Sequence, residues 1–320
     1  MRWLVLALAC VLAFSLAHEA AAGATVFKQK GTDGDDALTA LGGDLAESVV
    51  QKGGLGDDTL TADMQGGNDT VKQDGGEGDD TLDADGGDDD DTIEQSGGYG
   101  DDAVTAVGGD GNDKITQSGG YGDDTLTADG DDGNDIIEQR SGGLPTGVLA
   151  ATNVLTATGG DGHDKISQFG GKGDETMTAD GGDGNDNITQ YGGGGDDVMT
   201  ANGGDGNNVI YQSGGGGADT LVAEGGAGND TVTMHGGSGW DTFTYYCTPG
   251  TDTLAIDGGG GHDSVEIYCR FQDIRIVDKK GVLLFQRGAA PTTIITARRL
   301  ANITVFDDDD TTSLWAGGAR

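Results

Sequence analysis

The sequence predicts an all-β fold, a right-handed parallel β-roll or β-solenoid of about eleven 22-residue coils with an atypical C-terminal cap. Glycine pairs recur every 22 residues, and a fixed short period is typical of a solenoid. The composition agrees, because 64 glycines, 3 prolines and 5% aromatic residues among 320 do not suit a conventional globular core and exclude collagen. The pairs begin at Gly53, Gly75, Gly97 and Gly119, and again at Gly170, Gly192, Gly214, Gly236 and Gly258.

Residues 1–24 predict a secretory signal peptide. A basic residue precedes an apolar run over residues 3–17, and small residues follow over 20–24. We expect cleavage after Ala22 or Ala24, and therefore a secreted, extracellular or cell-surface protein. The apolar run is too short for a comfortable membrane span and no other segment is long and apolar enough, so we expect no transmembrane segment.

Residues 25–269 predict the roll, in which each coil has two similar halves of 11 residues. Positions eight and ten of a half point to the same side, because successive side chains of a strand alternate. We therefore expect an aliphatic ladder in a thin two-sheet roll, with alanines on one side and a glutamine ladder facing them. Stacked about 4.8 Å apart, the glutamine amides can hydrogen-bond along the axis; alternatively, they lie half solvated at the sheet margin. The inward pairs include Leu60 and Ala62, Leu126 and Ala128, Ile93 and Gln95, and Ile115 and Gln117.

Two segments depart from the repeat. An insertion over residues 141–153 replaces one turn, after which the strand from Val154 returns in phase. A surface loop tolerates such a change of length, so we expect it to interrupt one row of sites without disturbing the stack. Residues 270–320 lack glycine pairs and contain apolar runs, which predicts a capping segment that protects the sheet edge.

The chain is strongly acidic, with 56 acidic and 17 basic residues and a formal charge of −39. Nucleic acid and anionic membranes would repel it, so neither is an expected partner. High charge with low hydrophobicity would normally indicate disorder unless something outside the chain stabilises it, and a divalent cation is the candidate.

Each half begins with the pattern G-G-x-G-x-D-x-U-x, where U is a large aliphatic residue, as in G-G-Y-G-D-D-A-V from Gly97 to Val104. This pattern resembles the haemolysin-type calcium-binding repeats of the RTX (repeats-in-toxin) family, over about residues 31–269. The resemblance implies a parallel β-roll whose turns bind several Ca²⁺ ions. The unit departs from the family's nine residues, because two residues are added at the end of each strand.

An aspartate stands at the sixth position of most turns, where its carboxylate can join backbone carbonyls in a calcium site. The resemblance implies that the aspartates of successive coils share each ion. Glu175, Asn208 and Asn153 replace the aspartate, so sites touching them should be weaker or empty. A simpler interpretation is that the aspartates cap turns and solvate the surface. The expected ligands are Asp36, Asp58, Asp80, Asp102, Asp124, Asp197, Asp219, Asp241 and Asp263 on one edge, and Asp69, Asp91, Asp113, Asp135, Asp164, Asp186, Asp230 and Asp252 on the other.

Cys247 and Cys269 lie 22 residues apart at the same position of neighbouring units, so they should stack on adjacent coils. A coil spacing of about 4.8 Å falls within the Cα separations that a disulfide accepts, and secreted proteins fold under oxidising conditions. We expect a disulfide; the alternatives are two free thiols or a metal site.

The sequence contains no H-E-x-x-H, G-x-S-x-G or phosphate-loop pattern. His163 and His262 stand where turns usually have Asn or Asp, so we interpret them as turn residues. We expect no enzyme activity, and a secreted calcium-binding protein with a structural or adhesive role at cell-surface polysaccharide or matrix.

Two other functions stay open. One is a non-catalytic accessory module of an extracellular enzyme. The other is ice binding, because outward threonines form a T-x-T array that resembles the ice-binding surface of some β-solenoid antifreeze proteins. Threonine is also simply a good strand residue, and Asp83 interrupts the array. The array includes Thr59 and Thr61, Thr125 and Thr127, Thr176 and Thr178, and Thr242 and Thr244.

Overall fold

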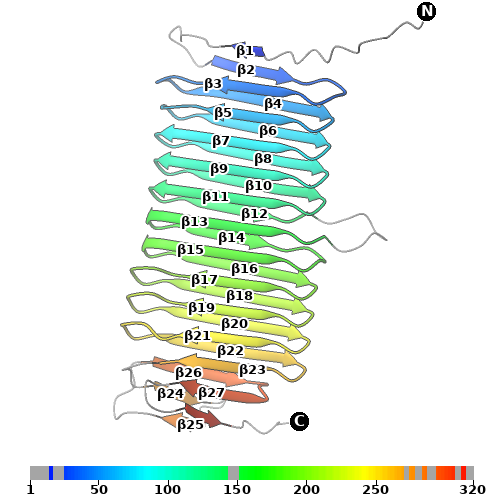
Figure 1. The fold of residues 1–320 in the computed structure, drawn as a ribbon. Helices are drawn as coiled ribbons and strands as arrows, with labels where there is room; N and C mark the ends of the chain where they lie inside the picture. Colours follow the sequence, from blue (N-terminus) through cyan, green and yellow to red (C-terminus); the bar gives the residue numbers. More distant parts are fainter. Residues whose placement is uncertain are drawn as a thin grey trace, which may run out of the picture.

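The computed structural model describes residues 14–16, 25–142, 151–269, 274–277, 283–286, 293–306 and 311–314 of the chain. Within these ranges there is no helix, and parallel strands stack as a β-solenoid of about eleven turns (Figure 1). The predicted fold class is confirmed.

The solenoid consists of two 14-stranded sheets, here called sheet A and sheet B, and each coil adds one strand to both. Sheet A contains, in spatial order, β1 (Phe14–Leu16), β3 (Ala37–Leu41), β5 (Thr59–Asp63), β7 (Thr81–Asp88), β9 (Ala103–Asp110), β11 (Thr125–Asp132), β13 (Val154–Gly162), β15 (Thr176–Gly184), β17 (Val198–Asn202), β19 (Thr220–Glu224), β21 (Thr242–Tyr246), β23 (Ser264–Tyr268), β27 (Asn302–Phe306) and β28 (Thr311–Leu314). Sheet B contains β2 (Thr25–Lys30), β4 (Glu47–Leu55), β6 (Thr70–Glu77), β8 (Thr92–Tyr99), β10 (Lys114–Tyr121), β12 (Ile136–Arg140), β14 (Lys165–Phe169), β16 (Asn187–Gly194), β18 (Val209–Gly216), β20 (Thr231–Ser238), β22 (Thr253–Gly260), β26 (Thr293–Arg298), β24 (Ile274–Val277) and β25 (Leu283–Gln286).

Equivalent residues of successive coils pair in parallel, so each repeat position forms a column along the axis. Leu60 pairs with Leu82 in sheet A, and Gln95 pairs with Gln117 in sheet B. The insertion does not break this register, because Leu126 pairs with Leu155 on the next coil. The return in phase is therefore confirmed; residues 143–150 of the insertion lie outside the described residues.

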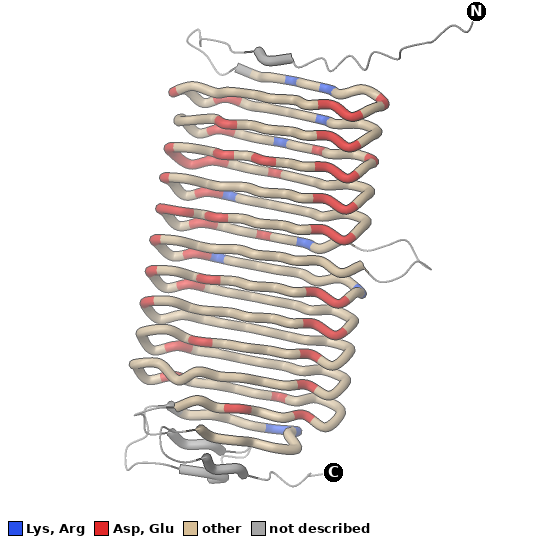
Figure 2. The backbone as a smooth tube through the Cα atoms, viewed as in Figure 1, with Lys and Arg blue, Asp and Glu red and all other residues tan. Residues whose placement is uncertain are grey.

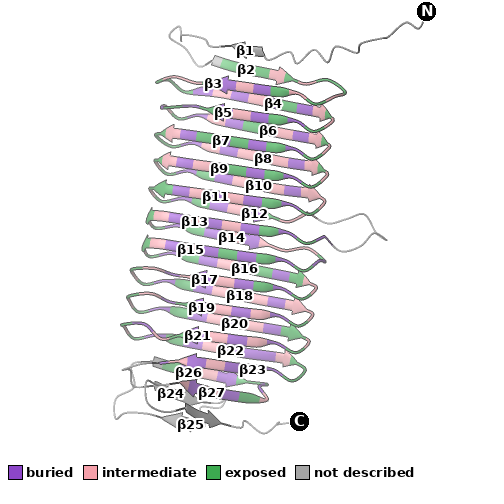
Figure 3. Cartoon of the chain, in the orientation of Figure 1, coloured by how far each residue is buried: buried purple, intermediate pink, exposed green. Residues whose placement is uncertain are grey.

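Burial alternates along the repeat strands, as the period of two requires, except at β22, where Asp257 is also buried (Figure 3). The inward aliphatic and alanine columns are fully buried, and the glutamine column beside them is between 0 and 4% exposed from Gln51 to Gln212. The predicted columns are confirmed, and the alternative of half-solvated glutamines is wrong.

The glutamines form a ladder in which all hydrogen bonds between side chains point toward the preceding coil. Each Nε2 donates to Oε1 of the preceding glutamine, for instance from Gln117 to Gln95 at 2.9 Å. The same nitrogen donates to a backbone carbonyl of sheet A, which is Thr127 O in this coil, at 2.8 Å. The ladder therefore satisfies buried amides and also joins the two sheets.

The segment predicted as a cap begins beyond Cys269. Its strands β26 and β27 continue sheets B and A in parallel, whereas β25 and β28 add antiparallel strands at the end. Asp257, which is 3% exposed, accepts ion pairs from Arg298 and Arg299 of the last coil. These ion pairs fix the last coil to the solenoid.

Of the segment predicted as a signal peptide, the structure describes Phe14–Leu16, which pair with β3 as strand β1. Among the residues that the structure places, no helix is long and apolar enough to span a membrane.

Candidate metal sites at the turns

Acidic residues follow both edges of the solenoid, where the chain turns from one sheet to the other (Figure 2). The sixth turn position forms one column on each edge. The first-edge row comprises Asp36, Asp58, Asp80, Asp102, Asp124, Asn153, Glu175, Asp197, Asp219, Asp241 and Asp263. The second-edge row comprises Glu47, Asp69, Asp91, Asp113, Asp135, Asp164, Asp186, Asn208, Asp230 and Asp252.

The row residues point into the solenoid instead of into solvent. Apart from the half-buried Asp36, they are at most 6% exposed. One carboxylate oxygen, Oδ1, accepts the backbone N–H of the row residue one coil earlier, as in the bond of 2.7 Å from Asp58 N to Asp80. The aspartates therefore connect successive coils, and the interpretation that they merely solvate the surface does not fit their burial.

The other carboxylate oxygen, Oδ2, has no hydrogen-bond partner among the described residues in nearly all predicted ligands. It is buried and unpaired in every one of them except Asp36 and Asp252, and Glu175 Oε2 is unpaired as well. Thr32 Oγ1 donates to Asp36 Oδ2 at 2.9 Å, and Tyr245 donates to Asp252 Oδ2 at 3.1 Å. Each unpaired oxygen is costly unless a proton or a cation satisfies it.

Most turns begin with a glycine, and the carboxylate lies against it; Met64 and Cys247 stand at this position in the Asp69 and Asp252 turns. A Cβ on Gly53 would stand 2.2 Å from Asp58 Oδ2 and 2.4 Å from the carbonyl oxygen of Gly75, the first glycine of the next coil. A carboxylate oxygen and a carbonyl oxygen thus border the same small space. We call this the oxygen space of the turn.

Asn208 shows that a hydrogen-bond donor fits in the oxygen space of a turn. Its Oδ1 takes the usual N–H, from Asp186 at 2.8 Å. Its Nδ2 stands in place of the unpaired oxygen and donates to the carbonyls of Gly225, on the next coil, at 3.1 Å and of Gly204, in its own turn, at 3.3 Å. An equivalent aspartate presents an oxygen to those carbonyls, so a positively charged or hydrogen-bearing species is needed between them.

Burial raises the pKa of the row carboxylates from Asp58 to Asp263 on the first edge and from Asp69 to Asp252 on the second, because the charged form loses its hydration. Neighbouring carboxylates of the row raise it further, while the N–H bond to Oδ1 lowers it. No ion pair between described residues reaches a row carboxylate. The pKa is raised to about 7 in Asp69, Asp91, Asp102, Asp135 and Asp219, and to about 6 in Asp80, Asp113, Asp124, Asp164 and Asp230.

The structure does not gather the predicted ligands into carboxylate clusters. Over the described part of the chain, no three His, Cys, Asp or Glu side chains converge as a metal site would require. The oxygens available at a turn are one carboxylate oxygen and backbone carbonyls of glycines. Calcium accepts both kinds of ligand, so the residues fit calcium with the backbone as the main donor.

The fifth turn position forms a second, exposed row that sequence reasoning missed. Asp57, Asp79 and Asp101 each accept the N–H of the fifth residue one coil later, at 2.9 Å for the pair Asp79–Asp57. On the other edge Asn112 and His163 do the same. These bonds run opposite to those of the buried rows, so successive coils are connected in both directions. The recurrence of Asp or Asn at this position was the available signal.

The replaced positions have partners of their own within the chain. Asn153, beside the insertion, donates from Nδ2 to Glu175 Oε1 at 3.3 Å. Glu47 begins the second-edge row and accepts the N–H of Gly43 at 3.0 Å, although its turn lacks the fourth glycine that would have identified it.

Cys247 and Cys269 lie on neighbouring coils with Cα atoms 4.8 Å apart, and the structure joins them in the predicted disulfide. Cys247 occupies the place of the first glycine in the Asp252 turn.

No family model matches the chain, and none of the curated proteins is detectably similar to it in sequence.

Proposed function

We propose that the chain is a secreted calcium-binding protein of the RTX kind, in which Ca²⁺ completes the two rows of buried carboxylates. The observation that carries the proposal is the oxygen space of the turns, where Oδ2 and glycine carbonyls face one another. Asn208 supports it, because its NH₂ group donates to the carbonyls that border this space.

Calcium suits these turns better than other common cations do. It takes carboxylate and backbone carbonyl oxygens in flexible geometry, whereas Mg²⁺ demands a near-ideal octahedron and keeps several waters. Transition metals prefer imidazole or thiolate ligands, which neither row contains. A proton can also satisfy the unpaired oxygen in place of calcium. The pKa of Asp102 is raised to about 7, so protons compete with calcium for this carboxylate at mildly acidic pH.

Coupling of folding to calcium means that the protein becomes rigid only after export from the cell. Where free calcium is low, unpaired buried carboxylates oppose folding, and the chain stays loose. After export into millimolar calcium, the ions satisfy the turns and the solenoid becomes rigid. A rigid, elongated secreted molecule suits a structural or adhesive role at cell-surface polysaccharide or matrix, and its adhesion should require calcium.

A calcium titration followed by far-ultraviolet circular dichroism tests the coupling, with magnesium as the matched control. We expect a cooperative rise of β-sheet signal with calcium and none with magnesium. A complete β-sheet signal in excess chelator would contradict the coupling and leave the aliphatic and glutamine columns as the source of stability.

A second candidate function is ice binding by the outer face of sheet A. Thr105, Thr127, Thr156, Thr178 and Thr200 stand on five consecutive coils in one outward column. Such a regular, uncharged column is the feature that resembles the ice-binding surface of some β-solenoid antifreeze proteins. Thermal hysteresis in calcium tests this candidate, and its absence would remove it.

A further inference from the structure

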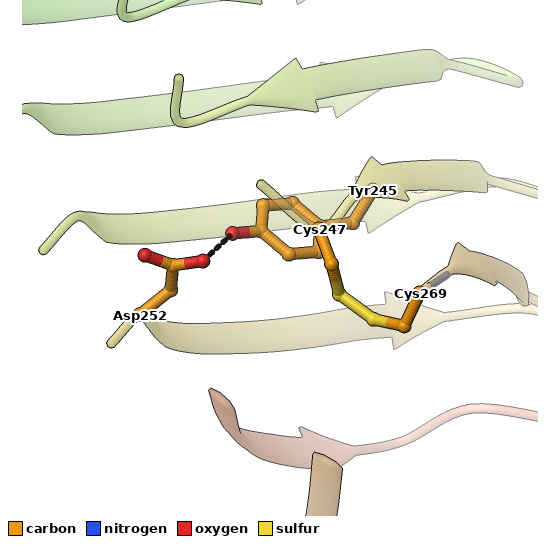
Figure 4. Close-up of a disulfide and its surroundings, with 4 residues drawn as sticks. All are labelled: Tyr245, Cys247, Asp252 and Cys269. Carbon is orange, nitrogen blue, oxygen red and sulfur yellow. Dashed lines mark hydrogen bonds between the residues drawn. A yellow bond between two sulfur atoms is a disulfide. The ribbon is translucent and has the colours of Figure 1, made fainter. Parts of the chain in front are cut away.

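Asp252, the last residue of the second-edge row, has a second carboxylate oxygen that is paired. Asp252 is 1% exposed like its row, and its Oδ1 accepts the N–H of Asp230 at 3.2 Å. Its Oδ2 accepts the hydroxyl of Tyr245 at 3.1 Å, and Figure 4 shows this hydroxyl pointing at the carboxylate. Asp230, one coil earlier, keeps an unpaired Oδ2.

Tyr245 reaches the turn from inside the solenoid. It is fully buried on β21 and pairs with Ala223 of the preceding coil, in the column that holds alanines farther up. An alanine is too short to reach the turn, whereas a phenol spans the distance. The glutamine ladder ends one coil earlier, and Met234 takes the glutamine position in the coil of Tyr245.

We infer that the Tyr245 hydroxyl takes the place of the cation in the Asp252 turn, which therefore closes without metal. The inference rests on the proposed calcium function, since it concerns which turns take an ion. The hydroxyl supplies to Asp252 Oδ2 the hydrogen-bond donor that Asp230 Oδ2 lacks. In the Asn208 turn the donor is the Nδ2 of Asn208 itself.

Two other connections at this end also need no cation, whereas Asp241 and Asp263 on the first edge keep an unpaired Oδ2. The disulfide joins the coils of Cys247 and Cys269, and Asp257 is paired with Arg298 and Arg299. We therefore expect the second edge at the Asp252 turn to be less sensitive to chelator than the turns whose Oδ2 is unpaired.

Two matched variants on adjacent coils test the assignment, Asp230→Asn and Asp252→Asn. Bound calcium is counted by equilibrium dialysis of the full-length protein at saturating calcium. We expect D230N to bind about one ion fewer than wild type, because it removes a ligand oxygen from the oxygen space. D252N should bind the wild-type number, because its turn holds no ion. Loss of an ion in D252N equal to that in D230N would overturn the inference.

The variant Tyr245→Phe tests the hydroxyl itself, with Tyr246→Phe, which changes an exposed ring on the same strand, as its control. In chelator, with enough of a stabilising osmolyte to keep the metal-free chain folded, Y245F should melt at lower temperature than wild type because Asp252 Oδ2 loses its donor. Y246F should match wild type under the same conditions. A Y245F melting temperature equal to wild type in chelator would overturn the inference. Wild-type protein that binds no calcium in the dialysis would instead overturn the proposed function, and the inference with it.

Discussion

At the scale of single residues, one atom of the sixth turn residue determines the partner that a turn needs. In Asp102 this atom is an unpaired oxygen, and in Asn208 it is a nitrogen that donates to two glycine carbonyls. The remaining oxygen accepts the same backbone N–H in both cases. The backbone therefore accommodates either residue, and the choice between them sets whether the turn needs a cation.

Asp102→Asn should consequently have opposite effects with and without calcium. In chelator, with enough of a stabilising osmolyte to keep the metal-free chain folded, we expect the free energy of unfolding to rise by about 1–3 kcal/mol, because a buried unpaired oxygen is replaced by a paired donor. In saturating calcium we expect a loss, because one ion no longer binds. Chemical denaturation under both conditions measures the two effects.

The control for this variant is Asp101→Asn at the exposed fifth position. Asparagine keeps the oxygen that accepts the N–H of Asp123, so little change is expected in chelator. If D102N destabilises the metal-free protein, its Oδ2 is already satisfied and the argument for a cation there fails.

At the scale of the element, the glutamine ladder ends on an unpaired atom. Gln212 Oε1 is buried without a partner, because Met234 follows it on the next coil. Within the ladder each Oε1 accepts from the following glutamine, as Gln95 does from Gln117. The cost of losing a glutamine should therefore depend on its place in the ladder.

Gln117→Met should cost more than Gln212→Met, although both replace a buried amide by a side chain of similar size. Q117M leaves Gln95 Oε1 newly unpaired, which costs about 1–3 kcal/mol in addition to the lost bonds. Q212M removes one unpaired oxygen and leaves another on Gln190, so the number of unpaired oxygens is unchanged. Thermal melting in calcium compares the two variants. Equal decreases in melting temperature would show that an uninterrupted ladder is no more stable than an interrupted one.

The period of the sequence was sufficient to predict the strands, their register and the inward columns, because alternation within a strand fixes which side chains meet. It could not predict which carboxylate oxygen is left unpaired, since this depends on how Asp58 turns toward Gly53. Nor could it predict the bond from Tyr245 to Asp252. That bond depends on the reach of a ring across the interior, not on a repeat position.

At the scale of the whole molecule, the charge of −39 is divided between exposed acids and two buried rows. Exposed acids are solvated, and the row carboxylates are not. Stability of the metal-free fold therefore depends on whether the rows are protonated, and stability of the calcium-bound fold depends on whether they are ionised. The two forms should respond to pH in opposite directions.

Between about pH 4 and pH 7 the metal-free folded chain should lose stability as the pH rises. The folded-state pKa of Asp102 and Asp135 is raised to about 7 from the ordinary value of 3.8, so the folded chain binds more protons than the unfolded chain in this range. The stabilising contribution of these protonated aspartates is therefore complete below the unfolded-state pKa of 3.8. It is lost as the pH rises through the folded-state pKa of about 7.

In saturating calcium the same interval should show the reverse slope, because Ca²⁺ needs the ionised carboxylates that protons would occupy. Melting temperatures measured across this range, once in chelator and once in calcium and both with the osmolyte that keeps the metal-free chain folded, should therefore cross. A metal-free protein that melts at higher temperature as the pH rises would mean that the buried rows are already paired without a cation. The charge of the rows would then have no part in coupling calcium to folding.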